Sequence, residues 1–232
     1  MGQEKVAAEQ KKRRMRIWIP ALCLLAFIAA FLILRAFRWS QEGESASLLT
    51  LIDEEHTVED SYSVEFTLLG DGQMLDSRCV DDYEAMIAAC VQAGGRPELR
   101  ASFRTSDAQA EVYEQALAAL IDQGMSREWA EQVLQKQEEK PGLSEHQLGL
   151  AVDLFEEGSE LAPEEQGDTF TLRWLRENAW RYGFVLRYPE GKSEQTGKDY
   201  RPWHFRYVGV SAAAQMHELD LTLEEYVRMF YS

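Results

Sequence analysis

The sequence predicts an α+β domain with a small antiparallel sheet flanked by helices, preceded by a membrane-spanning helix. Beyond residue 63, helix-like and strand-like segments are mixed without the regular βαβ alternation that a parallel sheet requires. With 232 residues, 45% of them hydrophobic, the chain can bury one good core. The third observation is an uncharged apolar run at residues 17–34. Eighteen such residues are long enough to cross the hydrocarbon layer.

The apolar run, IWIPALCLLAFIAAFLIL, directly follows the basic segment KKRRMR. Lys and Arg are retained on the cytoplasmic side of a membrane, so residues 1–16 are predicted to be a cytoplasmic tail. Residues 17–35 are then a single-pass anchor in the cell membrane, and the rest of the chain is extracytoplasmic. A cleaved signal peptide would have a shorter apolar core and a small-x-small cleavage site, which the following RAFRWSQEGESAS does not offer.

Charge divides the chain in the same way. Residues 1–38 carry net charge +6, so the remainder must carry −22 to reach the total of −16. So acidic an outer region repels phosphate backbones, which argues against nucleic-acid binding. Residues 36–62 are polar and acidic and are predicted to form a stalk, and residues 63–232 the outer domain. The oligomeric state is left open by the sequence.

Within the outer domain, the predicted strands and helices follow from local patterns. Strands are expected where apolar and β-branched residues gather, at residues 63–69, 98–104, 151–155, 184–188 and 204–208. Helices are expected where apolar residues recur at helical spacing, at residues 82–93, 106–120, 126–137, 169–183, 211–219 and 223–231. Ser106 and Ser126 can cap two of them, and Gly94 and Gly183 can end two others.

Two cysteines, Cys79 and Cys90, fall in the outer domain, where a disulfide is permitted. Eleven residues of helix would separate them by about 16 Å. A disulfide needs Cα atoms within roughly 7 Å, so this pair closes only if the chain before Asp81 folds back. The sequence leaves the pairing open.

Two of the four histidines lie in segments that can build a metal site. The stretch SEHQLGLAVDLF holds His146 and Asp153 on either side of Gly149, which allows the backbone to turn, and DYRPWHFRYVG holds His204. Imidazole and carboxylate are suitable Zn²⁺ ligands, and catalytic zinc sites use three protein ligands with an open position for water. A structural hydrogen-bonded pair is the alternative for His146 and Asp153. The remaining histidines, His56 and His217, are expected to be surface or packing residues.

Four ordered segments resemble the VanY-type D-alanyl-D-alanine carboxypeptidases. SEHQLGLAVD is similar to their SxHxxGxAxD motif and PWHFRYVG to their second zinc motif. ASFRTSDAQ resembles their SGYRSxxxQ segment, and GFVLRYPEGKSEQTG the run that leads to the last zinc ligand. The resemblance covers roughly residues 76–226. It implies the zinc DD-peptidase fold, which Hedgehog proteins share, and removal of D-alanine from peptidoglycan stem peptides.

The resemblance also implies residue roles. His146, Asp153 and His204 match the zinc ligands, and Ser144 matches the serine beside the first. Arg104 matches the arginine that engages the carboxyl-terminal region of the substrate, and a guanidinium holds a carboxylate with two charge-assisted hydrogen bonds. The glutamine of the same segment is matched by Gln109, which is expected to order the site.

One position departs from the family. Its Glu-x-Trp-His pattern supplies a glutamate as general base, and here that position is Arg201. Arginine stays protonated and cannot act as a base. Either another carboxylate replaces the glutamate, with Asp199, Glu190 and Glu194 nearest in sequence, or the domain binds stem peptides with little turnover. Related enzymes of the same fold cut L,D or L-Ala-D-Glu bonds, and a structural zinc domain without a peptide ligand is a third possibility.

Overall fold

The computed structural model describes residues 47–52, 56–58, 64–137 and 139–231. Within them, residues from Leu48 onward form one compact unit. No helix in these ranges is both long enough and apolar enough to cross a bilayer. The predicted tail and anchor, and the stalk before Ser47, lie outside the described residues.

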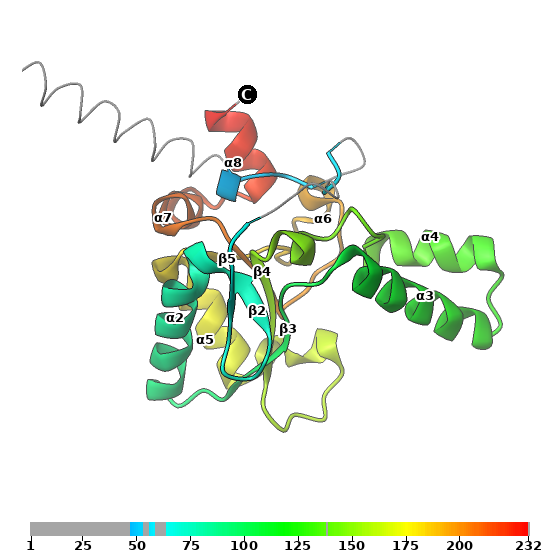
Figure 1. Ribbon diagram of the computed structural model, residues 1–232, viewed down its shortest axis with the longest axis horizontal. Coiled ribbons are helices and arrows are strands. Elements are labelled where there is room, and N and C mark those ends of the chain that lie inside the picture. The colour runs from blue at the N-terminus through cyan, green and yellow to red at the C-terminus, as the bar shows by residue number, and fades with distance from the viewer. Residues whose placement is uncertain (1–46, 53–55, 59–63, 138, 232) are drawn as a thin grey trace, which may run out of the picture. The chain divides into compact units, whose positions relative to one another are not determined.

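A four-stranded antiparallel sheet forms the centre of the unit (Figure 1), in the order β3-β4-β6-β5. Its strands are β3 (Pro97–Ala101), β4 (Ala151–Glu156), β5 (Phe184–Leu186) and β6 (His204–Tyr207). A separate hairpin pairs β1 (Phe66–Leu68) with β2 (Met74–Asp76). The predicted α+β class with an antiparallel sheet is therefore confirmed.

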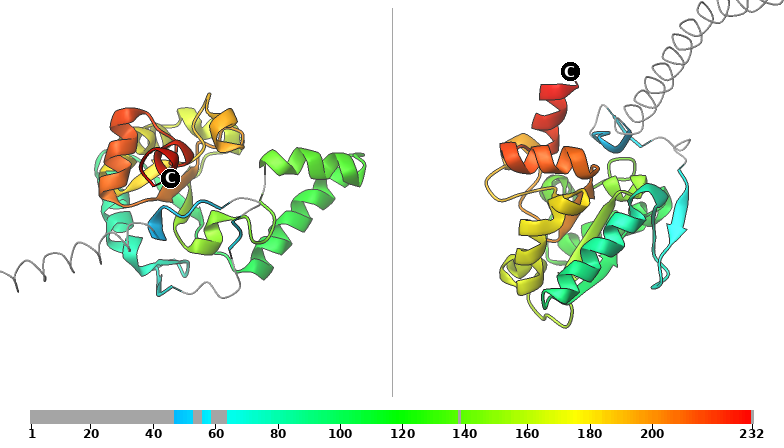
Figure 2. Two further views of the ribbon diagram at one scale, coloured as in Figure 1. Left: turned by 90° about the horizontal axis from the view of Figure 1, so that it is seen from above. Right: turned by 90° about the vertical axis from the view of Figure 1, so that its left-hand side faces the viewer.

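The sheet is covered by helices whose apolar faces supply the core. Strands β4 and β6 are buried along almost their whole length, although they carry the polar residues Asp153, His204 and Arg206. The helices α2 (Val80–Gln92) and α5 (Phe170–Asn178) pack against the sheet and lie side by side (Figure 2). The sequence predicted a helix that runs on to Gly183. Helix α5 instead ends at Asn178 and is followed by the 3₁₀ turn η4 (Ala179–Tyr182).

Helices α3 (Ser106–Asp122) and α4 (Arg127–Gln137) form a hairpin that projects from the sheet (Figures 1 and 2). It has a small core of its own, built by Tyr113, Leu117, Ala130 and Leu134. The N-cap of α3 is Thr105, whose hydroxyl accepts from the Ala108 amide, and not Ser106 as predicted. The hairpin returns the chain to the sheet just before the first histidine motif.

The C-terminal helices α7 (Val210–Leu219) and α8 (Leu223–Phe230) build a second cluster around Met216, Leu223 and Tyr226. The remaining short elements are η1 (Ser77–Cys79), η2 (Glu145–Leu148), η3 (Pro163–Asp168) and α6 (Ser193–Thr196).

The compact unit begins earlier than the sequence predicted. Leu48 and Leu49, placed in a stalk by the sequence, are 8% and 4% exposed and belong to the two main core clusters. The fully buried Arg206 donates hydrogen bonds from Nη2 to the carbonyls of Leu48 (2.9 Å) and Thr50 (3.1 Å). The residues around Leu48 and Leu49 are mostly polar and acidic, so the sequence predicted a stalk, whereas this short apolar segment completes the core.

Cys79 and Cys90 are both free and buried, so the chain before Asp81 does not bring them into a disulfide. Burial raises the pKa of Cys79 to about 12 and that of Cys90 to about 11. The thiolate is the reactive form, so neither thiol should react at pH 8 in the native protein.

We expect both cysteines to be labelled by a maleimide only after unfolding in urea, as followed by peptide mass mapping. The raised pKa values also set a pH dependence. Between about pH 9 and 12 the unfolded thiols lose protons that the folded ones keep, so stability should fall as pH rises through this window. Fast labelling of either thiol in the native state would contradict this burial.

Candidate metal centre

The three predicted ligands meet at the junction of η2, β4 and β6. His146 lies in η2, Asp153 in the middle of β4, and His204 opens β6, where it is the direct register partner of Asp153. One ligand atom from each residue lies within 4.8 Å of the others. The sheet register thus joins two motifs that are about fifty residues apart in sequence.

Gly149 makes the connection between His146 and Asp153 possible. Its φ is +71°, a region that favours glycine, and its N–H donates to the His146 carbonyl. A Cβ there would lie 2.6 Å from the Phe66 ring. The turn therefore requires glycine for both conformation and space, as the sequence suggested.

The orientation of His146 suits a metal. Its Nδ1 lies 2.7 Å from the Ser102 carbonyl, which can only accept, so Nδ1 carries the hydrogen. Its Nε2 then presents a lone pair, 3.2 Å from Asp153 Oδ2, which is also an acceptor. Two facing acceptors need a shared cation, which can be a proton or a metal ion.

His204 is held from both sides. Its Nδ1 lies 2.8 Å from Asp153 Oδ1, and its Nε2 lies 3.6 Å from Glu145 Oε2, just beyond hydrogen-bond range. His204 Nε2 and Glu145 Oε2 are both buried, and neither has a hydrogen-bond partner in the described part of the chain. A carboxylate facing the outer nitrogen of a ligating histidine is the usual way such a ring is oriented.

Glu145, which the sequence did not single out, is anchored in a buried ionic network. Arg187 Nε donates to Glu145 Oε1 at 2.8 Å, and Arg206 Nη1 lies 2.9 Å from the same oxygen without hydrogen-bond geometry. The other end of the Arg187 guanidinium pairs with Glu224 on α8 at 2.6 Å. Burial opposes ionisation of Glu145, but the charges of Arg187 and Arg206 hold its pKa well below the usual range.

The electrostatics of the cluster favour a bound cation. Burial disfavours the Asp153 carboxylate, yet the charges and hydrogen bonds of His146 and His204 hold its pKa well below the usual range. Burial would lower the pKa of His204, but its hydrogen bond to Asp153 and the nearby negative charge of Glu145 raise it to about 9. The same acidic neighbours that hold a proton on the imidazole would attract a divalent metal.

The other predicted site residues lie around this cluster. Arg104 Nη2 is 3.6 Å from Asp153 Oδ2, and its Nη1 donates to Gln109 Oε1 at 3.2 Å. The Gln109 amide donates in turn to the Glu139 carbonyl at 2.8 Å. Ser144 is fully buried just before η2, and its hydroxyl has no hydrogen-bond partner among the described residues. The fold therefore gathers Arg104, Gln109 and Ser144 near the ligand cluster.

Arg201, at the family's base position, and Asp199, the possible substitute nearby in sequence, lie in different surroundings. Arg201 is 5% exposed and directs Nη1 to Glu139 Oε1 at 2.6 Å. Asp199, the nearest candidate substitute by sequence, is exposed, and the described part of the chain holds no hydrogen bond or ion pair of its carboxylate with the ligand cluster. The carboxylate next to Arg201 is instead Glu139, from the segment that follows α4.

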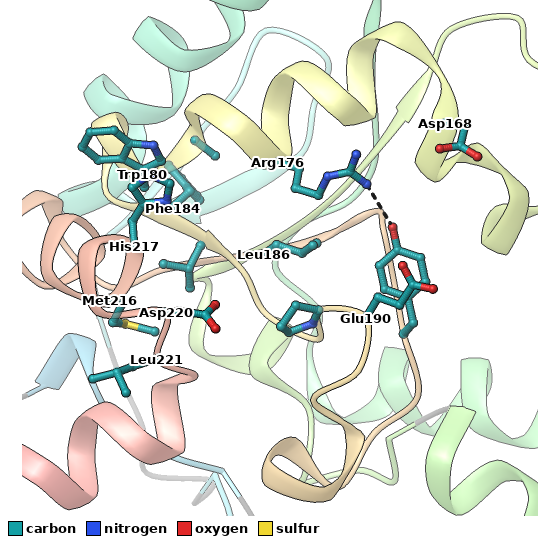
Figure 3. Close-up of a pocket in the computed structure, with 14 residues that line it drawn as sticks. Asp168, Arg176, Trp180, Phe184, Leu186, Glu190, Met216, His217, Asp220 and Leu221 are labelled. Carbon is teal, nitrogen blue, oxygen red and sulfur yellow. Dashed lines mark hydrogen bonds between the residues drawn. The ribbon is translucent and has the colours of Figure 1, made fainter.

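A cavity of about 450 Å³ lies elsewhere, lined by residues of η4, β5 and α7 among others (Figure 3). There Arg176 donates to the Tyr200 hydroxyl at 3.5 Å, and Trp180 stacks on His217 with ring centroids 4.4 Å apart. None of the three candidate ligands lines this cavity. Chemistry and burial make the His-Asp-His cluster the candidate site, and His217 packs on Trp180.

A family model described as VanY, D-alanyl-D-alanine carboxypeptidase, matches residues 72–210, which contain all the motif segments. The chain belongs to the VanY family. A relative from Enterococcus faecalis (strain ATCC 700802 / V583), a D-alanyl-D-alanine carboxypeptidase, is 34% identical over 187 residues, which are 81% of this chain and 68% of the relative.

Solved VanY structures share the fold. VanYB in complex with D-alanine-D-alanine superposes with a TM-score of 0.72 at 34% identity, over 78% of this chain and 98% of that one. A point mutant of the vancomycin-resistance D,D-pentapeptidase VanY, from a VanB-type cassette and in complex with Zn(II), gives 0.71 at 34% identity, over 78% and 99%. A VanY homologue thus carries zinc, and this chain holds a His-Asp-His group that fits a metal ion.

Proposed function

We propose that the protein is a zinc D-alanyl-D-alanine carboxypeptidase that removes the terminal D-alanine of peptidoglycan stem peptides. The observation that carries this proposal is the buried cluster of His146, Asp153 and His204, whose ligand atoms lie within 4.8 Å of one another. Two neutral imidazoles and one carboxylate leave an open position on a tetrahedral ion. Support also comes from the VanY structures that hold Zn(II) or D-alanine-D-alanine.

Zinc in this site would polarise the scissile carbonyl and lower the pKa of water near it. Arg104 would bind the terminal carboxylate of the peptide, because a guanidinium offers two parallel N–H donors. Gln109 orients Arg104 through the bond to Nη1, and Ser144 offers a hydroxyl with unused hydrogen-bonding capacity beside the first ligand. In this role, Gln109 is a positioning residue and Arg104 a binding residue.

The second candidate function is a wall-binding or regulatory module that keeps the metal but turns substrate over poorly. Arg201 favours it, because the family's proton acceptor is missing from that position. Its charge does not count against metal binding, since Glu139 neutralises the guanidinium at 2.6 Å. The two functions make the same prediction for peptide binding and opposite predictions for turnover.

Incubation with zinc and a stem pentapeptide ending in D-alanyl-D-alanine should release one D-alanine per peptide, detected by mass spectrometry. A stem tetrapeptide measures L,D cleavage in parallel. Arg104→Ala should raise KM at least tenfold, because a bidentate charged contact is lost. Zinc-loaded protein that binds the pentapeptide without releasing D-alanine would favour the wall-binding module.

We also propose that residues 17–35 anchor the domain outside the cell membrane. Support comes from the uncharged run and the basic segment before it. A protease added to intact cells should then degrade the chain beyond Trp39 and spare the residues before Ile17. Full protection of the chain would contradict this orientation.

A further inference from the structure

A buried ion pair lies where the family's general base is missing. Glu139 follows α4, its side chain is 4% exposed, and its Oε1 lies 2.6 Å from Arg201 Nη1 and 3.8 Å from Lys198 Nζ. Gln109 fixes its backbone carbonyl. Since Gln109 also holds Arg104, which contacts Asp153, a chain of contacts joins Glu139 to the ligand cluster.

A second route leads from the pair to the other side of the cluster. The Arg201 carbonyl accepts from the His204 amide, and the Arg201 guanidinium lies 4.9 Å from the centre of the Tyr188 ring. That ring is in turn 5.2 Å from the His204 ring. Burial disfavours the Glu139 carboxylate, but the charges of Arg201, Lys198, His204 and His146 hold its pKa below the usual value.

We propose that Glu139 is the proton acceptor of the hydrolysis and that Arg201 holds its carboxylate beside the ligand cluster. The carboxylate that the family carries at the position of Arg201 is supplied here from the segment after α4, and a guanidinium takes the vacated position. This inference rests on the carboxypeptidase function proposed above.

The proposed step balances without a further reactant. Water attacks the scissile carbonyl carbon, and Glu139 takes one of its protons as the C–O bond forms. When the C–N bond breaks, the same proton passes from Glu139 to the leaving amine of D-alanine. The water oxygen becomes one of the two oxygens of the new carboxyl group of the peptide, and the former carbonyl oxygen is the other.

A purely structural role is the competing explanation. Arg201 Nη2 donates to the Lys136 carbonyl at 3.2 Å and Lys198 Nζ to the Gln135 carbonyl at 3.0 Å, so both cations also hold the end of α4. Cations favour this end because the helix dipole is negative there. Glu139 would then serve only to neutralise buried charge, and its loss would disturb folding and metal binding together.

Glu139→Gln separates these explanations, with Glu131→Gln on α4, whose side chain is 43% exposed, as the matched control. Steady-state kinetics on the zinc-loaded full chain are combined with zinc content, peptide affinity by calorimetry, and thermal unfolding of the metal-free protein. We expect kcat to fall about 100-fold, the lower end of what a positioned base contributes, with KM and zinc content unchanged. The control should match the parent.

The double variant Glu139→Gln with Arg201→Glu returns the carboxylate to the family position. The kcat of this double variant should lie within about tenfold of the parent. The kcat of the single variant Arg201→Glu should fall further below the parent, because the introduced glutamate and Glu139 would then be two neighbouring carboxylates, each of which disfavours the ionisation of the other. If Glu139→Gln does not fold, a folded and zinc-loaded double variant decides: restored release of D-alanine supports the proposal, and its absence overturns it.

Other outcomes also count against Glu139. Parent-like kcat in Glu139→Gln would overturn its role as base while leaving the carboxypeptidase function intact. Loss of kcat together with zinc, without recovery in the double variant, would leave only the structural role. A zinc-loaded parent that releases no D-alanine contradicts the proposed function itself, which is a separate result.

Discussion

Replacing His204 by alanine is expected to remove most of the bound zinc and to lower D-alanine release by about 10³-fold, while the fold persists. The ring contacts Asp153 and faces Glu145, so its loss opens one of three ligand positions. Since metal catalysis contributes several kcal/mol and each 1.36 kcal/mol is tenfold in rate, a fall of this size corresponds to loss of the metal. Metal analysis by mass spectrometry and the D-alanine assay measure the two effects.

His217→Ala is the matched control for this experiment. This histidine stacks on Trp180 beside the 450 Å³ cavity, and it is not one of the candidate ligands. Zinc content and D-alanine release should therefore stay at the level of the parent. A His204→Ala variant with full zinc would refute the ligand set, and equal loss in both variants would point to a folding defect.

Removing residues up to Ser63 is expected to destabilise the domain by about 5 kcal/mol, relative to a chain that begins at Ser47. Each buried leucine lost from a core typically costs 2–5 kcal/mol, and Leu48 and Leu49 are both buried. Arg206, with no exposed side-chain surface, also loses the Leu48 and Thr50 carbonyls as acceptors. A loss of this size is comparable with the whole stability of many domains.

Urea unfolding followed by circular dichroism measures this difference. A chain from Ser47 with Leu48→Ser and Leu49→Ser controls for length, and its midpoint should fall most of the way to that of the shorter chain. Because Arg206 also contacts Glu145, the shorter chain should bind zinc more weakly as well. Equal midpoints for the two lengths would show that the domain begins near Ser63 after all.

The sequence by itself determined the fold class and the core of the candidate site. Strand-like and helix-like segments mixed without regular βαβ alternation predicted the antiparallel α+β sheet, because side-chain periodicity is a local property that the chain carries wherever it packs. The residue types in the two histidine motifs suggested a metal site, and the resemblance to the VanY motifs implied the cluster of His146, Asp153 and His204 that the sheet brings together. Gly149 was recognisable in the same way, since a turn that only glycine fits leaves a local signature.

Only the tertiary structure decided the features that depend on contacts between distant segments. The substitute for the missing base was sought near Arg201 in sequence, at Asp199, whereas the carboxylate that meets Arg201 is Glu139, sixty-two positions earlier. Leu48 and Leu49 read as stalk because burial depends on partners elsewhere in the chain. Glu145 had no signal of its own, because its importance comes from Arg187, Arg206 and His204, which reach it from other elements. Such charged contacts have no period or local spacing, so only folding reveals them.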